Sequence, residues 1–293
     1  MHLIALTLLP AIHVSTPILW VVCVSIGLAT TPMWALIHEA IHGLLLPLPR
    51  ANAMAGRALA IVFGAPFRAL RFAHLRHHRY NRSPCAREEV YDPLKQKKVV
   101  AYFHHYVRIT VGLYFGEIAL LFLCFLPRAV LRKLVAAQCP AIDGTPGMAA
   151  FADRDILSVD GLREIRIDAF LTLTLFGIAV WLYADRWFVL LGLFGVRSLL
   201  ISQVDHAFHH GTPLDEKYFA LNLSLPRWAE RWMLNFNRHR AHHCYPQLPW
   251  KYLPAHADRC ESDMGFLRGV LRQWKGPIAI THFATRDTKS DDA

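Results

Sequence analysis

Histidines at helical spacing recur in four short windows of this chain. His239, His242 and His243 stand at positions i, i+3 and i+4, and these offsets place side chains on one face of a helix. Neutral imidazole is a good ligand for transition metals, whereas core packing does not require such clusters. The chain is therefore expected to fold so that the windows meet at a metal site. The other windows are HEAIH, HLRHH and HAFHH, and together the four hold 11 of the 17 histidines.

Long apolar runs make up much of the remaining sequence. Hydrophobic residues account for 54% of the 293 positions, more than an ordinary soluble domain of this size contains. The formal charge is +10, and nine lysines or arginines fall between Arg68 and Lys98, beside apolar segments. Cytoplasmic faces of membrane proteins carry such a surplus of positive charge, whereas a nucleic-acid-binding domain would place it on a soluble fold. The composition predicts an integral, multi-pass membrane protein with its histidine windows on the cytoplasmic side.

Individual apolar runs predict the membrane helices. Residues 18–37 form a long run that ends at the first histidine window. Residues 170–184 and 187–204 form two runs that only two charged residues separate, which predicts a tight helical hairpin. Residues 3–14 are short for a span and suggest either a short first helix or a start codon placed too late.

Three less regular segments are expected at the membrane surface. Residues 53–67 are too polar to cross and predict a half-inserted helix, and residues 218–236 predict an amphipathic interfacial helix. Residues 99–126 carry internal charges and are expected to lie along the interface. The predicted fold class is an all-α, multi-pass membrane protein with a cytosolic histidine-rich cap. It comprises a single domain over residues 1–275 and a polar C-terminal tail over residues 276–293.

The histidine windows and their neighbours resemble the three boxes of the membrane fatty acid desaturase and hydroxylase superfamily. The matching segments read HEAIHG, HLRHHRYN and NRHRAHHCYPQLPWKYLP, and the resemblance covers about residues 30–255. It implies a set of nine metal ligands, which are His38, His42, His74, His77, His78, His209, His239, His242 and His243.

One implied ligand stands in a segment that departs from the family pattern. Where the family has an asparagine four residues before a ligand histidine, this chain has Asp205 before His209. We expect His209 to be the ligand and Asp205 to orient an imidazole or hold a water. HAFHH is also a complete HxxHH box, so His206 and His210 remain alternative ligands. Asn237, just before the last box, is expected either to support a ligand or to cap a helix.

The resemblance also implies the cofactor and the source of electrons. Carbon–hydrogen bonds of an acyl chain are inert to acid–base chemistry, and zinc has no redox chemistry. Two iron ions held by imidazoles, with O₂ as co-substrate, meet the requirement. The six cysteines show no CxxC spacing, so an iron–sulfur site within the chain is not expected. The electron donor is therefore expected to be a separate protein, such as a ferredoxin, a rubredoxin or a cytochrome b5-type protein.

The implied activity is that of a lipid-metabolism oxidoreductase which desaturates a fatty acyl chain. The chain is expected to be linked to CoA, a carrier protein or a lipid. A hydroxylase, ketolase, acetylenase or terminal-alkene-forming decarboxylase would use the same boxes, and the position of the carbon decides among them. Arg71, Arg76 and Arg79 are expected either to bind the head group or to contact anionic lipid.

Two other classes of protein fit part of the pattern. HEAIH is a complete HExxH motif, in which Glu39 would be the general base of an intramembrane zinc protease. Asp143 or Asp160 would then supply the third ligand, but three HxxHH windows would have no purpose. A metal transporter would place its ligands inside the membrane at broken helices, whereas these windows lie beyond the ends of the apolar runs.

Overall fold

The computed structural model describes residues 1–12, 15–138, 147–257 and 263–283. Helices make up nearly all of the regular structure in these ranges, and only four short strands accompany them. The predicted all-α membrane fold is thereby confirmed. The chain divides into two compact units, residues 1–75 with 114–200 and residues 76–113 with 201–293. Asp143 and the end of the polar tail, residues 284–293, lie outside the described ranges.

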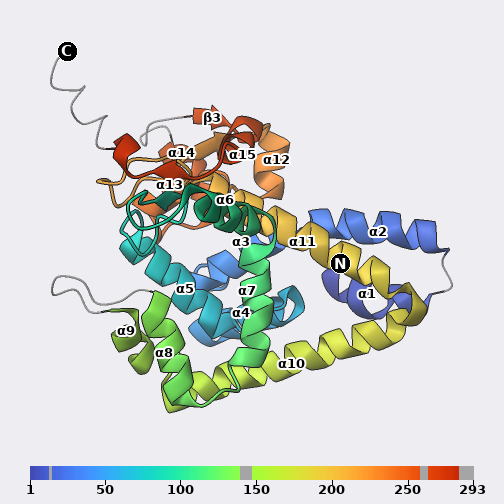
Figure 1. The fold of residues 1–293 in the computed structure, drawn as a ribbon. Coiled ribbons are helices and arrows are strands. Elements are labelled where there is room, and N and C mark those ends of the chain that lie inside the picture. The colour runs from blue at the N-terminus through green and yellow to red at the C-terminus, as the bar shows by residue number, and fades with distance from the viewer. Residues whose placement is uncertain (13–14, 139–146, 258–262, 284–293) are drawn as a thin grey trace, which may run out of the picture. The chain divides into compact units, whose positions relative to one another are not determined.

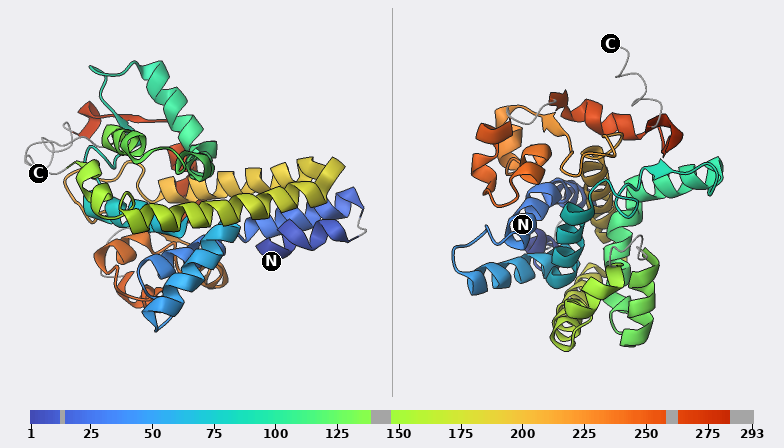
Figure 2. Two further views of the ribbon diagram at one scale, coloured as in Figure 1. Left: turned by 90° about the horizontal axis from the view of Figure 1, so that it is seen from below. Right: turned by 90° about the vertical axis from the view of Figure 1, so that its left-hand side faces the viewer.

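The regular structure in the described residues of unit 1 is helical. Its longest members are α10 and α11, and the chain reverses between them at a short 3₁₀ turn, as Figures 1 and 2 show. This is the hairpin that the sequence predicted. The helices are α1 (His2–Thr7), η1 (Leu9–Ala11), α2 (Thr16–Leu28), α3 (Thr30–Ile41), α4 (Pro49–Phe63), α5 (Phe67–Tyr80, as far as Leu75), α7 (Leu113–Leu123), α8 (Arg128–Gln138), α9 (Met148–Arg154), α10 (Val159–Tyr183), η3 (Ala184–Arg186) and α11 (Trp187–Ala207, as far as Leu200).

The turn of the hairpin packs against the N-terminal helices. Leu6 of α1 and Leu19 of α2 are fully buried in one apolar cluster with Leu193 of α11. Tyr183, the last residue of α10, donates a hydrogen bond from its hydroxyl to the carbonyl of Ala5 at 2.8 Å. Burial of this aliphatic surface, at roughly 25 cal/mol per Å², is what holds α1 and α2 to the hairpin.

A sharp bend separates α4 from α5. The two helices meet at 99°, which is the form of a broken span or a re-entrant loop. Gly64 ends α4 with a φ of +117°, which favours glycine, and a side chain there would meet the hydroxyl of Tyr114. Arg197 of α11 donates to the freed carbonyl of Phe63 at 2.6 Å. The bend agrees with the half-inserted helix predicted for residues 53–67.

Unit 2 combines short helices with two pairs of parallel strands. β1 pairs with β4, and β2 pairs with β3. Helices α12 to α15 gather near β3 in Figure 1. The elements are β1 (Val90–Tyr91), α6 (Lys98–Val107), the π-helix η2 (Arg108–Gly112), β2 (Asn222–Ser224), α12 (Arg227–Trp232), α13 (His239–Cys244), η4 (Trp250–Tyr252), α14 (Pro254–Ala257), β3 (Asp263–Gly265), α15 (Phe266–Gln273) and β4 (Ile278–Ala279).

Two sequence-based expectations differ from the structure of unit 2. The helix predicted over residues 218–236 is wrong, because only Arg227–Trp232 is helical and residues 222–224 form a strand. Pro226 accounts for the helix start, since a proline has no N–H to donate and disfavours helix in the preceding residue. The segment after Gly276 was expected as a polar tail, but it begins with β4, which pairs with β1.

Three helical segments in the described ranges are long and apolar enough to cross a membrane. They are Thr16–Ile41, Lys98–Leu123 and Val159–Ala207, and the last of these contains the hairpin. The first and third contain the predicted runs. Lys98–Leu123 was expected along the interface, yet its 26 residues exceed the roughly 20 that a crossing needs. Length and composition therefore favour an additional crossing by this segment, and its interfacial position stays a prediction.

Candidate metal centre

Four histidines of unit 2 form a compact group of ring nitrogens. His77 comes from α5, His209 from the turn after α11, and His239 and His243 from α13. The Nε2 atom of His77 lies 3.1 Å from that of His209 and 3.3 Å from that of His243. The Nε2 atoms of His243 and His239 are 3.1 Å apart. Three segments far apart in the sequence thus direct imidazole nitrogens at one point.

The spacing of these nitrogens fits a metal ion. An imidazole nitrogen lies about 2.1 Å from a bound transition metal, so two nitrogens at a right angle are about 3.0 Å apart and two opposite ones about 4.2 Å. All four ligand atoms of the group lie within 4.8 Å of one another, and the nearest pairs are at 3.1–3.3 Å. The donor set is all nitrogen, which suits iron, copper, nickel or zinc better than magnesium or calcium.

The remaining proposed ligands form smaller groups within each unit. In unit 1, His42 of α3 and His74 of α5 bring their Nε2 atoms to 3.0 Å, and the ring of His38 packs 4.5 Å from that of His74. In unit 2, His78 and His242 bring their Nε2 atoms to 3.0 Å. Helical spacing places the histidines of each window on one face, and the packing of separate helices brings the rings of different windows together.

Burial favours the neutral form of four of the proposed ligand imidazoles. The pKa of His77 is lowered to about 4, chiefly by removal from water, with Glu88 opposing the shift and Arg82 adding to it. Burial, followed by the neighbouring histidines, holds the pKa of His209 and His243 well below its usual range. Burial and then Arg71 lower the pKa of His42 to about 4. A neutral ring is the form that binds a metal, so the folded chain presents its ligands ready at neutral pH.

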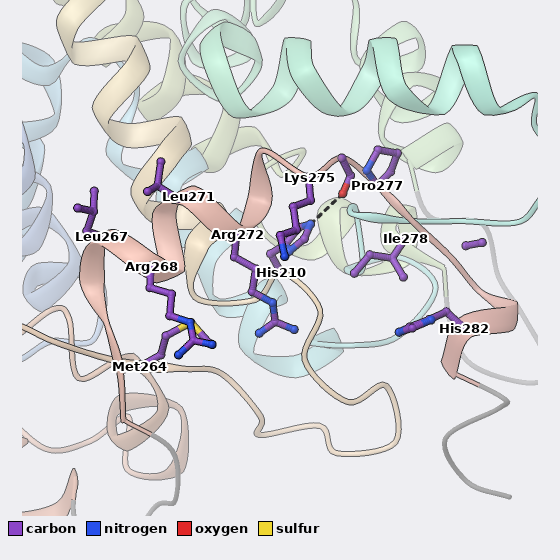
Figure 3. A pocket seen from close by; sticks show the side chains of 12 residues that line it. His210, Met264, Leu267, Arg268, Leu271, Arg272, Lys275, Pro277, Ile278 and His282 are labelled. Carbon is purple, nitrogen blue, oxygen red and sulfur yellow. Dashed lines mark hydrogen bonds between the residues drawn. The ribbon is translucent and has the colours of Figure 1, made fainter. Parts of the chain in front are cut away.

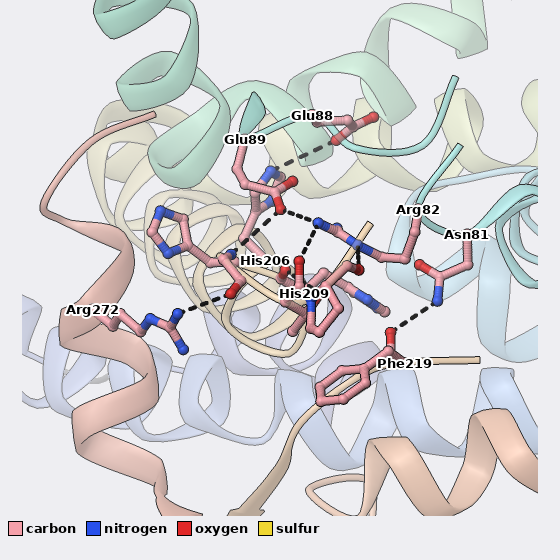
Figure 4. Close-up of polar contacts among 12 residues, drawn as sticks. Asn81, Arg82, Glu88, Glu89, His206, His209, Phe219 and Arg272 are labelled. Atoms are coloured by element: carbon pink, nitrogen blue, oxygen red, sulfur yellow. Dashed lines mark hydrogen bonds and ion pairs between the residues drawn. The ribbon is translucent and has the colours of Figure 1, made fainter. Parts of the chain in front are cut away.

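Ionic contacts fix the turn that carries His209. Arg82 is buried and donates to Glu89 at 2.6 Å, to the carbonyl of Thr212 at 3.0 Å and to that of Pro213 at 3.1 Å (Figure 4). The same Glu89 oxygen accepts from the amide of Gly211 at 3.4 Å. Arg272 of α15 donates to the carbonyl of Gly211 at 2.9 Å. Sequence reasoning missed Arg82 and Glu89, although Arg82 lies only four residues beyond the second histidine window.

The alternative ligands of the HAFHH window lie outside the four-histidine group. The Nε2 atom of His206 faces the carboxylate of Glu88 at 3.6 Å, and Glu88 also pairs with Arg108. The ring of His210 donates from Nε2 to the carbonyl of Gly276 at 3.0 Å. Asp205 lies near the end of α11 and is likewise not a member of the group. The geometry therefore favours His209 as the ligand from this window.

Two asparagines form hydrogen bonds around the last histidine window. Asn237 donates to the carbonyl of Leu223 and to Glu230, each at 2.9 Å, while the N-cap position of α13 belongs to Arg238. Its helix-capping role is therefore wrong, because its side chain ties the start of α13 to β2. Asn81 donates to the carbonyls of Lys217 and Phe219 at 2.8 and 3.0 Å and lies 3.5 Å from Nδ1 of His243. The sequence signal for Asn81 is its place three residues after the second window.

The basic residues predicted to bind a head group have different surroundings. Arg71 and Arg79 are exposed. Arg76 is buried, with its guanidinium 4.4 Å above the ring of Tyr80. A buried guanidinium stacked on an aromatic ring is not offered to a ligand in solvent. Binding of a head group or of anionic lipid by Arg71 and Arg79 stays a prediction.

Among the described residues of unit 1, no acid other than Glu39 of the motif itself is grouped with His38 and His42 to complete a zinc-protease pattern. Their neighbour within unit 1 is a third histidine, His74, rather than an acid. Asp160 is exposed in the first turn of α10, and Asp143 lies outside the described residues.

Comparison with known families identifies a match over most of the chain. The model of the family described as fatty acid desaturase matches residues 15–275. No curated protein matched the chain. No solved structure matched it either.

Proposed function

The chain belongs to the fatty acid desaturase family, and from this we propose that its nine clustered histidines hold two iron ions and that it desaturates a fatty acyl chain with O₂. The family supports the coarser statement that the protein is a membrane oxidoreductase of the desaturase type. The proposal adds the metal, its ligands and the reaction. Iron supplies the redox chemistry that oxidation of an unactivated carbon–hydrogen bond requires.

One observation carries the proposal. His77, His209, His239 and His243 converge within a single unit at distances that suit one metal ion. The side chains of His209, His239 and His243 are buried and His77 is half-buried, which limits competition from bulk water for a bound metal. The other five proposed ligands come from the histidine windows at α3, α5 and α13, and nine nitrogens are about the number that two irons need. Arg82, Glu89, Asn81 and Asn237 orient the segments that supply these rings.

We further propose the setting of the reaction. The excess of lysine and arginine beside the second window supports a cytoplasmic position for the histidines. A fatty acyl substrate linked to CoA, a carrier protein or a lipid follows from the family, as does an external electron donor. The chain supplies binding and orientation of the acyl chain, and the carbon nearest the metal decides between desaturation and hydroxylation.

The direct test is a comparison of metal content and lipid products. We expect cells that express the chain to contain new unsaturated acyl species, and the purified protein to carry about two irons per chain. His242→Ala removes a proposed ligand and is expected to abolish the products. His256→Ala, a histidine of α14 outside the clusters, serves as the matched control and is expected to keep them. Lipid profiles that are identical for the wild type and His242→Ala would refute acyl oxidation.

A further inference from the structure

An open cavity of about 950 Å³ lies beside α15 in unit 2. Its walls come from α15, from the segment that continues through β4, and from His210 (Figure 3). The volume is within the usual range for small-molecule sites, roughly 300–1,000 Å³. The cavity includes none of the nine proposed metal ligands.

The charged residues that line the cavity are all basic. Arg268, Arg272 and Lys275 follow one another on α15 and just beyond it at i, i+4 and i+7, so they share a helix face. The rings of His210 and His282 add two further nitrogen-bearing groups. Among the described residues that line the cavity there is no aspartate or glutamate. Such a site attracts an anion, and arginine in particular matches the oxygens of a phosphate.

An apolar surface adjoins the cations. Leu267 and Leu271 are 69% and 57% exposed and lie one position before Arg268 and Arg272, on a neighbouring stripe of the same helix. Pro277 and Ile278 extend the apolar part of the lining on the opposite wall, as Figure 3 shows. A ligand that fills this cavity therefore carries a charged group and a hydrocarbon portion side by side.

The cavity shares residues with the turn that carries His209. Arg272 donates to the carbonyl of Gly211 at 2.9 Å, and His210 donates to the carbonyl of Gly276 at 3.0 Å. These two hydrogen bonds join α15 and the segment after it to the residues that directly follow a proposed ligand. A molecule seated in the cavity is thus held within unit 2, against His210, the residue that directly follows the proposed ligand His209.

We propose that this cavity binds the phosphate ester of an amphiphile whose apolar portion rests on Leu267, Leu271 and Ile278. The inference deepens the proposed function and rests on it for the role of the ligand as substrate. Two sources offer this chemistry, a soluble acyl thioester that carries phosphates and a phospholipid of the bilayer. Arg268 and Lys275 contact the phosphate, and Arg272 joins the site to the His209 turn.

Binding to the full-length protein in neutral detergent tests the proposal without turnover. The double variant Arg268→Gln/Lys275→Gln removes two exposed cations of the cavity. The variant Lys133→Gln/Arg163→Gln removes two exposed cations of unit 1 and matches it in net charge. We expect palmitoyl-CoA to bind the wild type and the control equally, and the cavity variant about tenfold or more weakly, since charge-assisted contacts are lost. Palmitate, which has no phosphate, is expected to bind less tightly and to be less sensitive to the substitutions.

A second arm separates the two sources. Nanodiscs of phosphatidylcholine with and without phosphatidic acid replace palmitoyl-CoA as the probe. If the cavity variant binds only palmitoyl-CoA more weakly, the site is assigned to a soluble acyl thioester. If it binds only the nanodiscs with phosphatidic acid more weakly, the site is assigned to a membrane lipid. Either result supports the site. Equal binding of both probes by the cavity variant and its control overturns it. Because no step of oxidation is measured, a chain that binds the probe yet forms no unsaturated product refutes the proposed function alone.

Discussion

Replacement of Glu89 by glutamine tests whether the Arg82–Glu89 pair holds the metal-site turn. The side chains of Arg82 and Glu89 are only 1% and 4% exposed, and their contact is 2.6 Å long. Glu89→Gln keeps a hydrogen-bond acceptor of nearly the same size but leaves the guanidinium charge of Arg82 buried without its counter-ion. Loss of one partner of a buried pair costs about 3–5 kcal/mol. We expect the lower end of this range, about 3 kcal/mol, because the amide oxygen still accepts a hydrogen bond.

Thermal unfolding of the protein in detergent measures this loss. A loss of about 3 kcal/mol lowers the apparent Tm by roughly 6–12 °C for a protein of this size class. The matched control is Glu216→Gln, because Glu216 is 53% exposed and its contact with Arg240 is 3.8 Å long. An exposed pair contributes at most about 1 kcal/mol, so the control is expected to shift the Tm by a few degrees at most.

The same variant has a consequence for the metal site. Glu89 accepts from the amide of Gly211, two residues after His209. A turn that is less firmly held presents its imidazole less well, and loss of such support commonly costs tenfold or more in metal affinity. We expect Glu89→Gln to lose iron to a competing chelator at about one-tenth of the chelator concentration that the wild type tolerates. Similar Tm and iron retention for Glu89→Gln and Glu216→Gln would show that the buried pair does not organise the turn.

Three further predictions address the ligands and their environment. His209→Ala is expected to lower bound iron from about two to about one per chain, whereas His206→Ala keeps most of the iron. Elemental analysis of the purified variants measures the iron content. A larger loss of iron in His206→Ala than in His209→Ala would show that His206 is the ligand. Glu39→Gln is expected to retain iron and acyl oxidation, and a chain that instead lost a proteolytic activity would favour the zinc-protease alternative. In the metal-free protein, burial holds the pKa of His77 and His42 at about 4, below the ordinary 6.5. Their contribution to stability is therefore complete above pH 6.5 and is lost as the pH falls from 6.5 towards 4, so a Tm that stays constant over that interval would contradict the burial argument.

Local patterns were sufficient to predict the helical hairpin and the shared face of the last histidine window. His239, His242 and His243 share one face because the helix repeat dictates it, and α13 has that form. The hairpin of α10 and α11 followed from two apolar runs with charges between them. Both predictions depend only on residues close together in the sequence.

Contacts between distant segments lay beyond sequence reasoning. Nothing in the local sequence of β2 indicates that it pairs with β3, about 40 residues later, and the helix expected there was wrong. The support of the His209 turn by Arg82 joins residues 130 positions apart. Arg76 was expected on an exposed basic face, and its burial against Tyr80 depends on packing that a single helix pattern does not contain.

The guanidinium of Arg197 bears on how the chain is assembled in the membrane. This residue is fully buried within an apolar candidate span, where a charge without polar partners is costly. Its hydrogen bonds include those to the carbonyl of Phe63 and the hydroxyl of Tyr114, both of which precede it in the sequence. During synthesis from the N-terminus these acceptors emerge first, so they are already available when the arginine leaves the ribosome. The bend after α4 thus provides a hydrogen-bond acceptor for an arginine of α11, which is synthesised more than a hundred residues later.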